Sequence, residues 1–89
     1  KVVIITGASS GIGESCAHEF GKAGAKIVIT GRNQDKLDSV KTKLEAEGIE
    51  VLAISADAAI LEDNERMAKA VLARFGKIDI LLCNWHFFC

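Results

Sequence analysis

Four short apolar stretches recur along the chain, at 2–6, 26–30, 49–54 and 78–83, and each is rich in β-branched or branched aliphatic residues. Within them the hydrophobic positions run on with little alternation between polar and apolar residues. Such runs are typical of strands that are covered on both faces of a sheet. The pattern therefore predicts four buried strands.

Between these stretches, apolar residues recur at spacings of three and four, which places them on one face of a helix. The three stripes consist of Ile12, Cys16, Phe20 and Ala23; of Leu37, Val40 and Leu44; and, in a helix expected at 61–75, of the inward-facing Met67, Val71, Leu72 and Phe75. Asn33 precedes the second helix and can cap it. Gly24, Gly48 and Gly76 follow the three helices and predict their ends.

Strands and helices thus alternate in the order βαβαβαβ. Strands that are separated by single helices imply right-handed crossovers and a parallel sheet. Both faces of such a sheet need helical cover, which agrees with the continuous apolar runs. The sequence therefore predicts an α/β fold with three layers, α/β/α.

Composition narrows the possible partners. The 89 residues make one domain or part of one. A net charge of −1 argues against a nucleic-acid partner and gives no support for binding to a membrane surface. The odd number of cysteines, three, lacks the paired spacing of a secreted disulfide scaffold. We therefore expect reduced thiols and a cytoplasmic protein.

The turn after the first strand carries Gly7, Gly11 and Gly13, with Ser9 and Ser10 between them. The first glycine permits a tight turn, the second lets backbone approach a pyrophosphate, and the third lets the helix pack closely. The N–H groups at the start of a helix favour an anion. The turn is therefore predicted to bind phosphate groups, the alternative being a plain Gly/Ser connection.

The segment 6–13 (TGASSGIG) resembles the TGxxxGIG motif of the short-chain dehydrogenase/reductase family. The residues that match position for position are Thr6, Gly7, Gly11, Ile12 and Gly13. The resemblance continues to about Asn84 and covers the first four of roughly seven strands in the family. It implies part of a doubly wound, Rossmann-like parallel sheet, with strand order 3-2-1-4, that binds a dinucleotide.

The end of the second strand distinguishes the two nicotinamide cofactors. An acidic residue there would hold the 2′-hydroxyl of NAD, but the sequence has Arg32 and Asn33, with no carboxylate before Asp35. A guanidinium can clasp a 2′-phosphate through two hydrogen bonds. We therefore expect NADP(H) rather than NAD(H), with Arg32, Asn33 and a turn serine as contacts. A surface arginine at a helix entrance is the alternative.

Three more cofactor contacts are implied by the resemblance alone. In the family, an Asp after the third strand, here Asp57, hydrogen-bonds the adenine amino group. The backbone N–H of the next residue, here Ala58, meets a ring nitrogen. Asn84 matches the second Asn of the family's NNAG motif. For Asp57, a helix-capping or loop residue is the alternative.

The resemblance stops within that motif. Cys83 stands in place of its first Asn, and Trp85 and His86 replace its small Ala-Gly pair and would crowd the space beside the cofactor. We therefore divide the chain into a dinucleotide-binding half-domain, 1–84, and a divergent apolar tail, 85–89. We interpret this tail as a truncated or frame-shifted end; the alternative is that the exposed fourth strand and the aromatic tail self-associate.

Enzymes of the resembled family use a Ser and a Tyr-x-x-x-Lys pair, in which the Tyr donates and accepts the proton. The sequence contains no tyrosine, so we assign no catalytic residue, and we assign no metal site. We interpret the chain as the NADP(H)-binding portion of such a reductase, inactive alone. The reaction of the whole enzyme would be reversible hydride transfer between NADPH and a carbonyl or alcohol. A non-catalytic dinucleotide-binding module and an interaction fragment are the alternatives.

Overall fold

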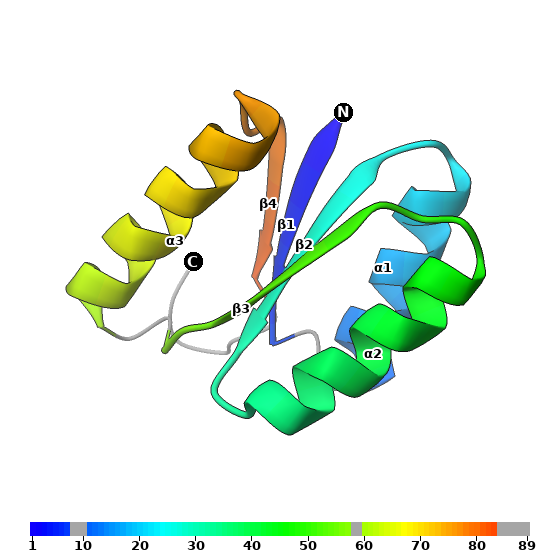
Figure 1. Ribbon diagram of the computed structural model, residues 1–89, viewed down its shortest axis with the longest axis horizontal. Helices are drawn as coiled ribbons and strands as arrows, with labels where there is room; N and C mark the ends of the chain where they lie inside the picture. The colour runs from blue at the N-terminus through cyan, green and yellow to red at the C-terminus, as the bar shows by residue number, and fades with distance from the viewer. Residues whose placement is uncertain (8–10, 58–59, 84–89) are drawn as a thin grey trace.

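The computed structural model describes residues 1–7, 11–57 and 60–83, and folds them into alternating strands and helices (Figure 1). The strands are β1 (Val2–Thr6), β2 (Lys26–Gly31), β3 (Val51–Ser55) and β4 (Ile80–Cys83). The helices are α1 (Gly11–Lys22), α2 (Gln34–Ala46) and α3 (Leu61–Phe75). The α/β alternation predicted from the sequence is confirmed.

The four strands form one parallel sheet in the order β3-β2-β1-β4, as expected. Helices α1 and α2 cover one face of this sheet and α3 covers the other, which gives three layers (Figure 1). Each crossover brings the chain back parallel to its previous strand. As a result, all four strands end at the same edge of the sheet.

The strands have two buried faces because alternate side chains serve two separate cores. Val3, Ile5 and Ile27 pack with Ala17, Leu37, Val40 and Leu44 beneath α1 and α2. On the opposite face, Val2, Ile4 and Val28 pack with Met67 and Val71 of α3. β1 is buried at all five positions. This explains why its sequence is apolar at every position before Thr6.

Two predicted boundaries are corrected by hydrogen bonding. Ile49 was expected in the third strand, but its N–H donates to the carbonyl of Leu44 at 3.2 Å and thereby closes the end of α2. β3 consequently starts at Val51. The fourth strand starts at Ile80 rather than at residue 78, because Asp79 meets β1 partly through its side chain, whose carboxylate accepts from the N–H of Val2 at 2.7 Å.

The predicted apolar face of α3 is also corrected. Met67 and Val71 are buried, and Phe75 packs partly against the same core, but Leu72 is 48% exposed. Successive helical residues are rotated by about 100°. Leu72 therefore turns away from the sheet when its neighbour Val71 faces it. The predicted end of α3 is confirmed, because Gly76 is its C-cap, with φ of 78° in the left-handed region.

Candidate functional site

Most of the candidate residues that the structure describes follow the carboxyl ends of three neighbouring strands. Gly7 follows β1, Arg32 follows β2 and Asp57 follows β3. Thr6 pairs with Thr30, and Thr30 pairs with Ile54, so these ends are in register. Adjacent strands lie about 4.8 Å apart. The fold therefore gathers residues that are separated by 25 positions or more along one edge, which we call the carboxyl edge.

Of the glycine turn, the structure describes Gly7 and the segment from Gly11 onward. Gly7 adopts φ of 67°, which is strained for a residue with a Cβ. α1 begins at Gly11, with Ile12 in its first turn, and Gly13 is buried there. A Cβ built on Gly11 meets no described atom within 4 Å outside its chain neighbours and the backbone of its own helix. Among the described residues, the amino end of α1 therefore leaves room for close approach at Gly11.

The end of β2 places a cation beside this turn. Arg32 is exposed at the entrance to α2. Asn33 is the N-cap, with its side-chain oxygen accepting from the N–H of Lys36 at 3.2 Å. The predicted cap is thus confirmed, while a contact between Asn33 and a cofactor stays a prediction. The exposure of Arg32 fits both a ligand contact and the alternative of a surface arginine.

Beyond the end of β3, Asp57 is held by a hydrogen bond from its backbone N–H. The last ladder bond joins the N–H of Ala56 to the carbonyl of Gly31 at 2.9 Å. The next N–H, that of Asp57, donates to Asp63 Oδ2 at 2.9 Å. Asp57 is partly buried and is not the N-cap of α3, which is Ile60. The contact of Asp57 with adenine therefore stays a prediction, beside the alternatives of a helix-capping or a loop residue.

Sequence reasoning missed two residues at this end of the sheet. Asp63 receives the N–H of Asp57, and Arg66 Nη2 donates to the carbonyl of Ser55 at 2.8 Å. Both lie in the first two turns of α3, where the pattern showed only a polar surface. The available signal was an acidic residue in the first turn of a helix, a position that favours capping interactions with nearby N–H groups.

Several predicted contacts lie outside the described residues. They are Ser9, Ser10, Ala58 and Asn84, together with the tail 85–89. The predicted cofactor contacts at these positions stay predictions. The candidate residues that the structure describes are Gly7, Gly11, Ile12, Gly13, Arg32, Asn33 and Asp57.

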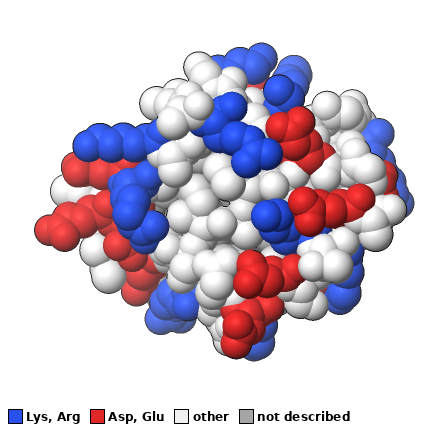
Figure 2. Space-filling view, viewed as in Figure 1, with Lys and Arg blue, Asp and Glu red and all other residues white. Residues whose placement is uncertain are grey.

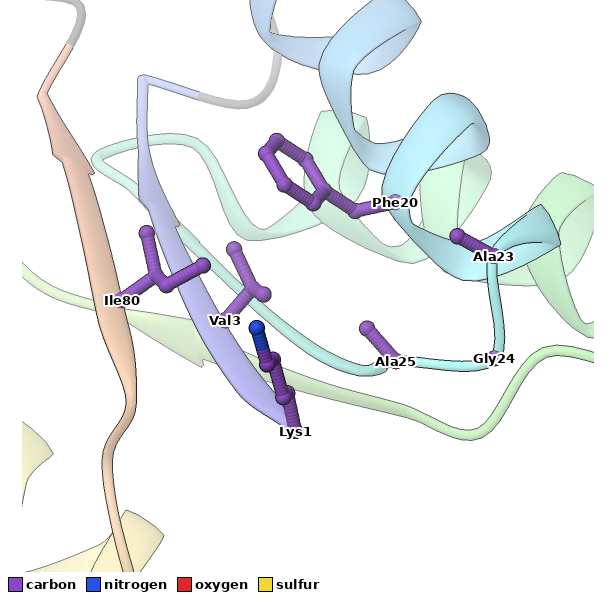
Figure 3. A pocket seen from close by; sticks show the side chains of 7 residues that line it. All are labelled: Lys1, Val3, Phe20, Ala23, Gly24, Ala25 and Ile80. Atoms are coloured by element: carbon purple, nitrogen blue, oxygen red, sulfur yellow. The ribbon is translucent and has the colours of Figure 1, made fainter.

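The opposite edge of the sheet carries a different feature. A hollow of about 370 Å³ is lined mainly by Val3, Phe20, Ala23 and Ile80 (Figure 3). These residues come from the beginnings of β1 and β4, from the last turn of α1 and from the residue that follows α1. The glycine turn lies at the other end of β1. The hollow is therefore separate from the carboxyl edge.

Charges of both signs are interspersed around an uncharged centre on the face shown in Figure 2. This face carries no extended basic field of the kind that binds nucleic acid. Within residues 1–7, 11–57 and 60–83, no helix has the length and apolarity needed to cross a bilayer. No group of three His, Cys, Asp or Glu residues in these ranges is placed to hold a metal ion.

Comparison with known proteins identifies the family. The family model described as short chain dehydrogenase matches residues 1–85. The chain therefore belongs to the short-chain dehydrogenase family. An uncharacterized oxidoreductase of Listeria innocua is 38% identical over 84 residues, which are 94% of this chain and 34% of the relative. An 11-beta-hydroxysteroid dehydrogenase-like protein of Arabidopsis thaliana is 44% identical over 85 residues, 94% of this chain and 25% of its own length.

Solved structures give the same fold. Actinorhodin polyketide ketoreductase with NADPH superposes with a TM-score of 0.91 at 31% identity, covering 94% of this chain and 32% of the other. An alcohol dehydrogenase from the archaeon Thermococcus sibiricus, complexed with 5-hydroxy-NADP, gives a TM-score of 0.86 at 38% identity, covering 91% and 35%. The chain thus spans about one third of the length of the proteins it matches.

Proposed function

We propose that this chain is the NADP(H)-binding part of a cytoplasmic short-chain dehydrogenase/reductase. The observation that carries the proposal is the gathering of Gly7, Arg32 and Asp57 at the carboxyl edge, beside the amino end of α1. The NADPH and 5-hydroxy-NADP complexes among the similar structures support the choice of cofactor.

Each part of the edge has a distinct role in this proposal. The turn from Gly7 to Gly13, with Ser9, Ser10 and the backbone of Ile12, holds the pyrophosphate. Arg32, with Asn33 beside it, holds the 2′-phosphate. Asp57 and Ala58, which follow β3, hold the adenine. Asn84 contributes from the end of β4. The order of these groups along the edge matches the order of the chemical groups in the dinucleotide.

The bound cofactor would supply the hydride for the reversible reduction of a carbonyl. These 89 residues contain no tyrosine, the proton donor expected for that step in this family. We therefore propose that they bind the cofactor and do not themselves catalyse its reaction with a substrate.

The affinity of an Arg32→Ala variant for NADPH and for NADH tests the proposal. Loss of a charge-assisted hydrogen bond costs about 1.5–3 kcal/mol. NADPH affinity should therefore fall roughly 10- to 100-fold, while NADH affinity changes little. Isothermal titration calorimetry measures both. Lys69→Ala is the matched control, because Lys69 is an exposed cation on α3 away from the carboxyl edge.

If Arg32→Ala leaves the ratio of the NADPH and NADH affinities unchanged, Arg32 does not bind the 2′-phosphate. If the unaltered chain binds NADH as tightly as NADPH, the choice of cofactor is wrong. If it binds neither, the role of the carboxyl edge in dinucleotide binding is wrong.

A second function, association through β4, is favoured by the apolar character of that strand. Among the described residues β4 pairs only with β1. Leu81 is 55% exposed on one face, and Ile80 borders the hollow on the other. We propose that copies of the chain associate through this edge and the tail 85–89. Apolar strand edges of this kind are templates for pairing.

Sedimentation analysis over a range of concentrations tests this association. Leu81→Lys, or removal of residues 85–89, should shift the chain toward the monomer. Leu61→Lys provides the control, because Leu61 is 72% exposed and belongs to the first turn of α3 rather than to β4. A chain that is monomeric at high concentration, or one whose association responds equally to both leucine variants, contradicts this role for β4.

A further inference from the structure

The peptide that carries Asp57 lies just beyond the sheet. The β2–β3 ladder ends where Ala56 donates to the carbonyl of Gly31. From there onward, neighbouring strands no longer fix the backbone. The direction in which the Asp57 side chain leaves the backbone therefore depends on the groups that hydrogen-bond to the neighbouring peptides.

Two side chains from α3 hold these groups. Asp63 Oδ2 accepts the N–H of Asp57 at 2.9 Å, and Arg66 Nη2 donates to the carbonyl of Ser55 at 2.8 Å. The two side chains also approach each other, with Arg66 Nη2 3.7 Å from Asp63 Oδ1. They are one turn apart on the same helix face, since their spacing is three residues.

Both bonds are charge-assisted and are spread over the two peptides that flank Ala56. Bonds of this kind are shorter and stronger than neutral ones. The carbonyl of Asp57 also accepts from the N–H of Ile60 at 2.9 Å. Asp57 is therefore held at both its N–H and its carbonyl.

We propose that Asp63 and Arg66 are positioning residues that orient Asp57 toward the adenine of the dinucleotide. This inference rests on the proposed function, in which Asp57 accepts a hydrogen bond from the adenine amino group. Neither residue touches the cofactor. Their effect is to set the direction of the Asp57 side chain, so they determine how well the site distinguishes adenine from other bases.

The test compares NADPH with its deamino analogue, in which hypoxanthine replaces adenine. The analogue lacks the amino group, so the unaltered chain should bind it about tenfold or more weakly, the value of a hydrogen bond to a charged group. Asp63→Ala should reduce this preference at least threefold. Asp63→Asn keeps an acceptor oxygen and should retain most of it. Glu62→Ala, which removes an exposed charge from the same helix turn, should leave the preference unchanged.

A merely structural role gives a different result, because general weakening of the site lowers both affinities and preserves their ratio. An unchanged ratio in Asp63→Ala overturns the proposal. A chain that binds NADPH and its analogue equally well refutes the adenine contact of Asp57, and the proposal with it. A chain that binds neither refutes the proposed function itself.

A second measurement uses the ligand-free chain. Hydrogen exchange at the Asp57 amide, followed by NMR, should accelerate several-fold in Asp63→Ala and less in Asp63→Asn. If Asp63→Ala fails to fold, Arg66→Met replaces it in both experiments, with Lys69→Met as its control. An Asp57 amide that exchanges at the same rate in the variants and the unaltered chain also overturns the proposal.

Discussion

Gly21 lies on the buried side of α1, where the helix passes close to Ile49. A Cβ built on Gly21 would come within 2.8 Å of both Ile49 Cγ1 and Ile49 Cγ2. Real Cβ atoms do not approach other atoms so closely. Ile49 itself is fixed, because it is buried and its N–H closes the end of α2. The absence of a side chain at Gly21 therefore allows α1 and α2 to close over the sheet.

Gly21→Ala should destabilise the fold in spite of the better helix propensity of alanine. Overpacking a core costs about 1–3 kcal/mol, and the gain in helix propensity is about 1 kcal/mol. We expect a net loss of up to about 2 kcal/mol in the free energy of unfolding, measured by urea denaturation. Lys22→Ala, at the next and exposed position, should be nearly neutral. A gain in stability from Gly21→Ala would show that the contact with Ile49 is not tight.

At the level of elements, Asp79 begins the pairing of β4 with β1. Its carboxylate accepts the N–H of Val2 at 2.7 Å, and its own N–H donates to the carbonyl of Val2 at 3.0 Å. The hydrogen bond from Val2 is the main cause that lowers the pKa of Asp79 below its ordinary value of 3.8, with a smaller contribution from Lys77. Partial burial opposes this lowering of the pKa.

This lowered pKa makes the stability of the fold depend on pH. Because the folded state favours the ionised carboxylate, Asp79 stabilises the fold above pH 3.8, and that stabilisation is lost as the pH falls through the lower folded pKa. The free energy of unfolding of Asp79→Asn should therefore be lower than that of the unaltered chain at pH 7. The difference should shrink between pH 4 and pH 2. Glu65→Gln on exposed α3 serves as the control. A difference that stays constant over this range would contradict the assignment.

Local patterns predicted most of the elements but not their long-range contacts. β1 and the caps at Asn33 and Gly76 follow from short segments, because their causes lie within a few residues. Ile49 was assigned to a strand, since an apolar residue in a strand and one that closes a helix look alike in sequence. The contact of Asp79 with Val2 joins residues 77 positions apart. No local pattern contains such information.

In the candidate site, too, local causes could be predicted from the sequence and long-range contacts could not. Gly7 was recognisable because a motif demands its conformation, and its φ of 67° confirms that geometry. Asp63 was missed because its partner is a backbone N–H, which every residue but proline has. Sequence therefore predicts residues that belong to a motif. It does not predict residues that act by holding another part of the backbone in place.

On the scale of the whole molecule, the parallel sheet separates two regions. The carboxyl edge gathers the glycine turn, Arg32 and Asp57, whereas the beginnings of the strands carry the apolar hollow. In open α/β sheets ligands bind outside the carboxyl ends of the strands. The similarity to relatives about three times as long extends over nearly the whole chain. This agrees with a ligand site at the carboxyl edge.

The most direct test of the central claim is a map of amide chemical-shift changes on the 89-residue chain as NADPH is added. The account predicts that the largest changes fall at Gly7, Gly11, Gly13, Arg32 and Asp57, and that NADH at the same concentration causes smaller ones. Residues of the hollow, such as Phe20 and Ala23, should be nearly unaffected. Changes that centre on the hollow, or an absence of change at the carboxyl edge, would contradict the assignment of this edge as an NADP(H) site.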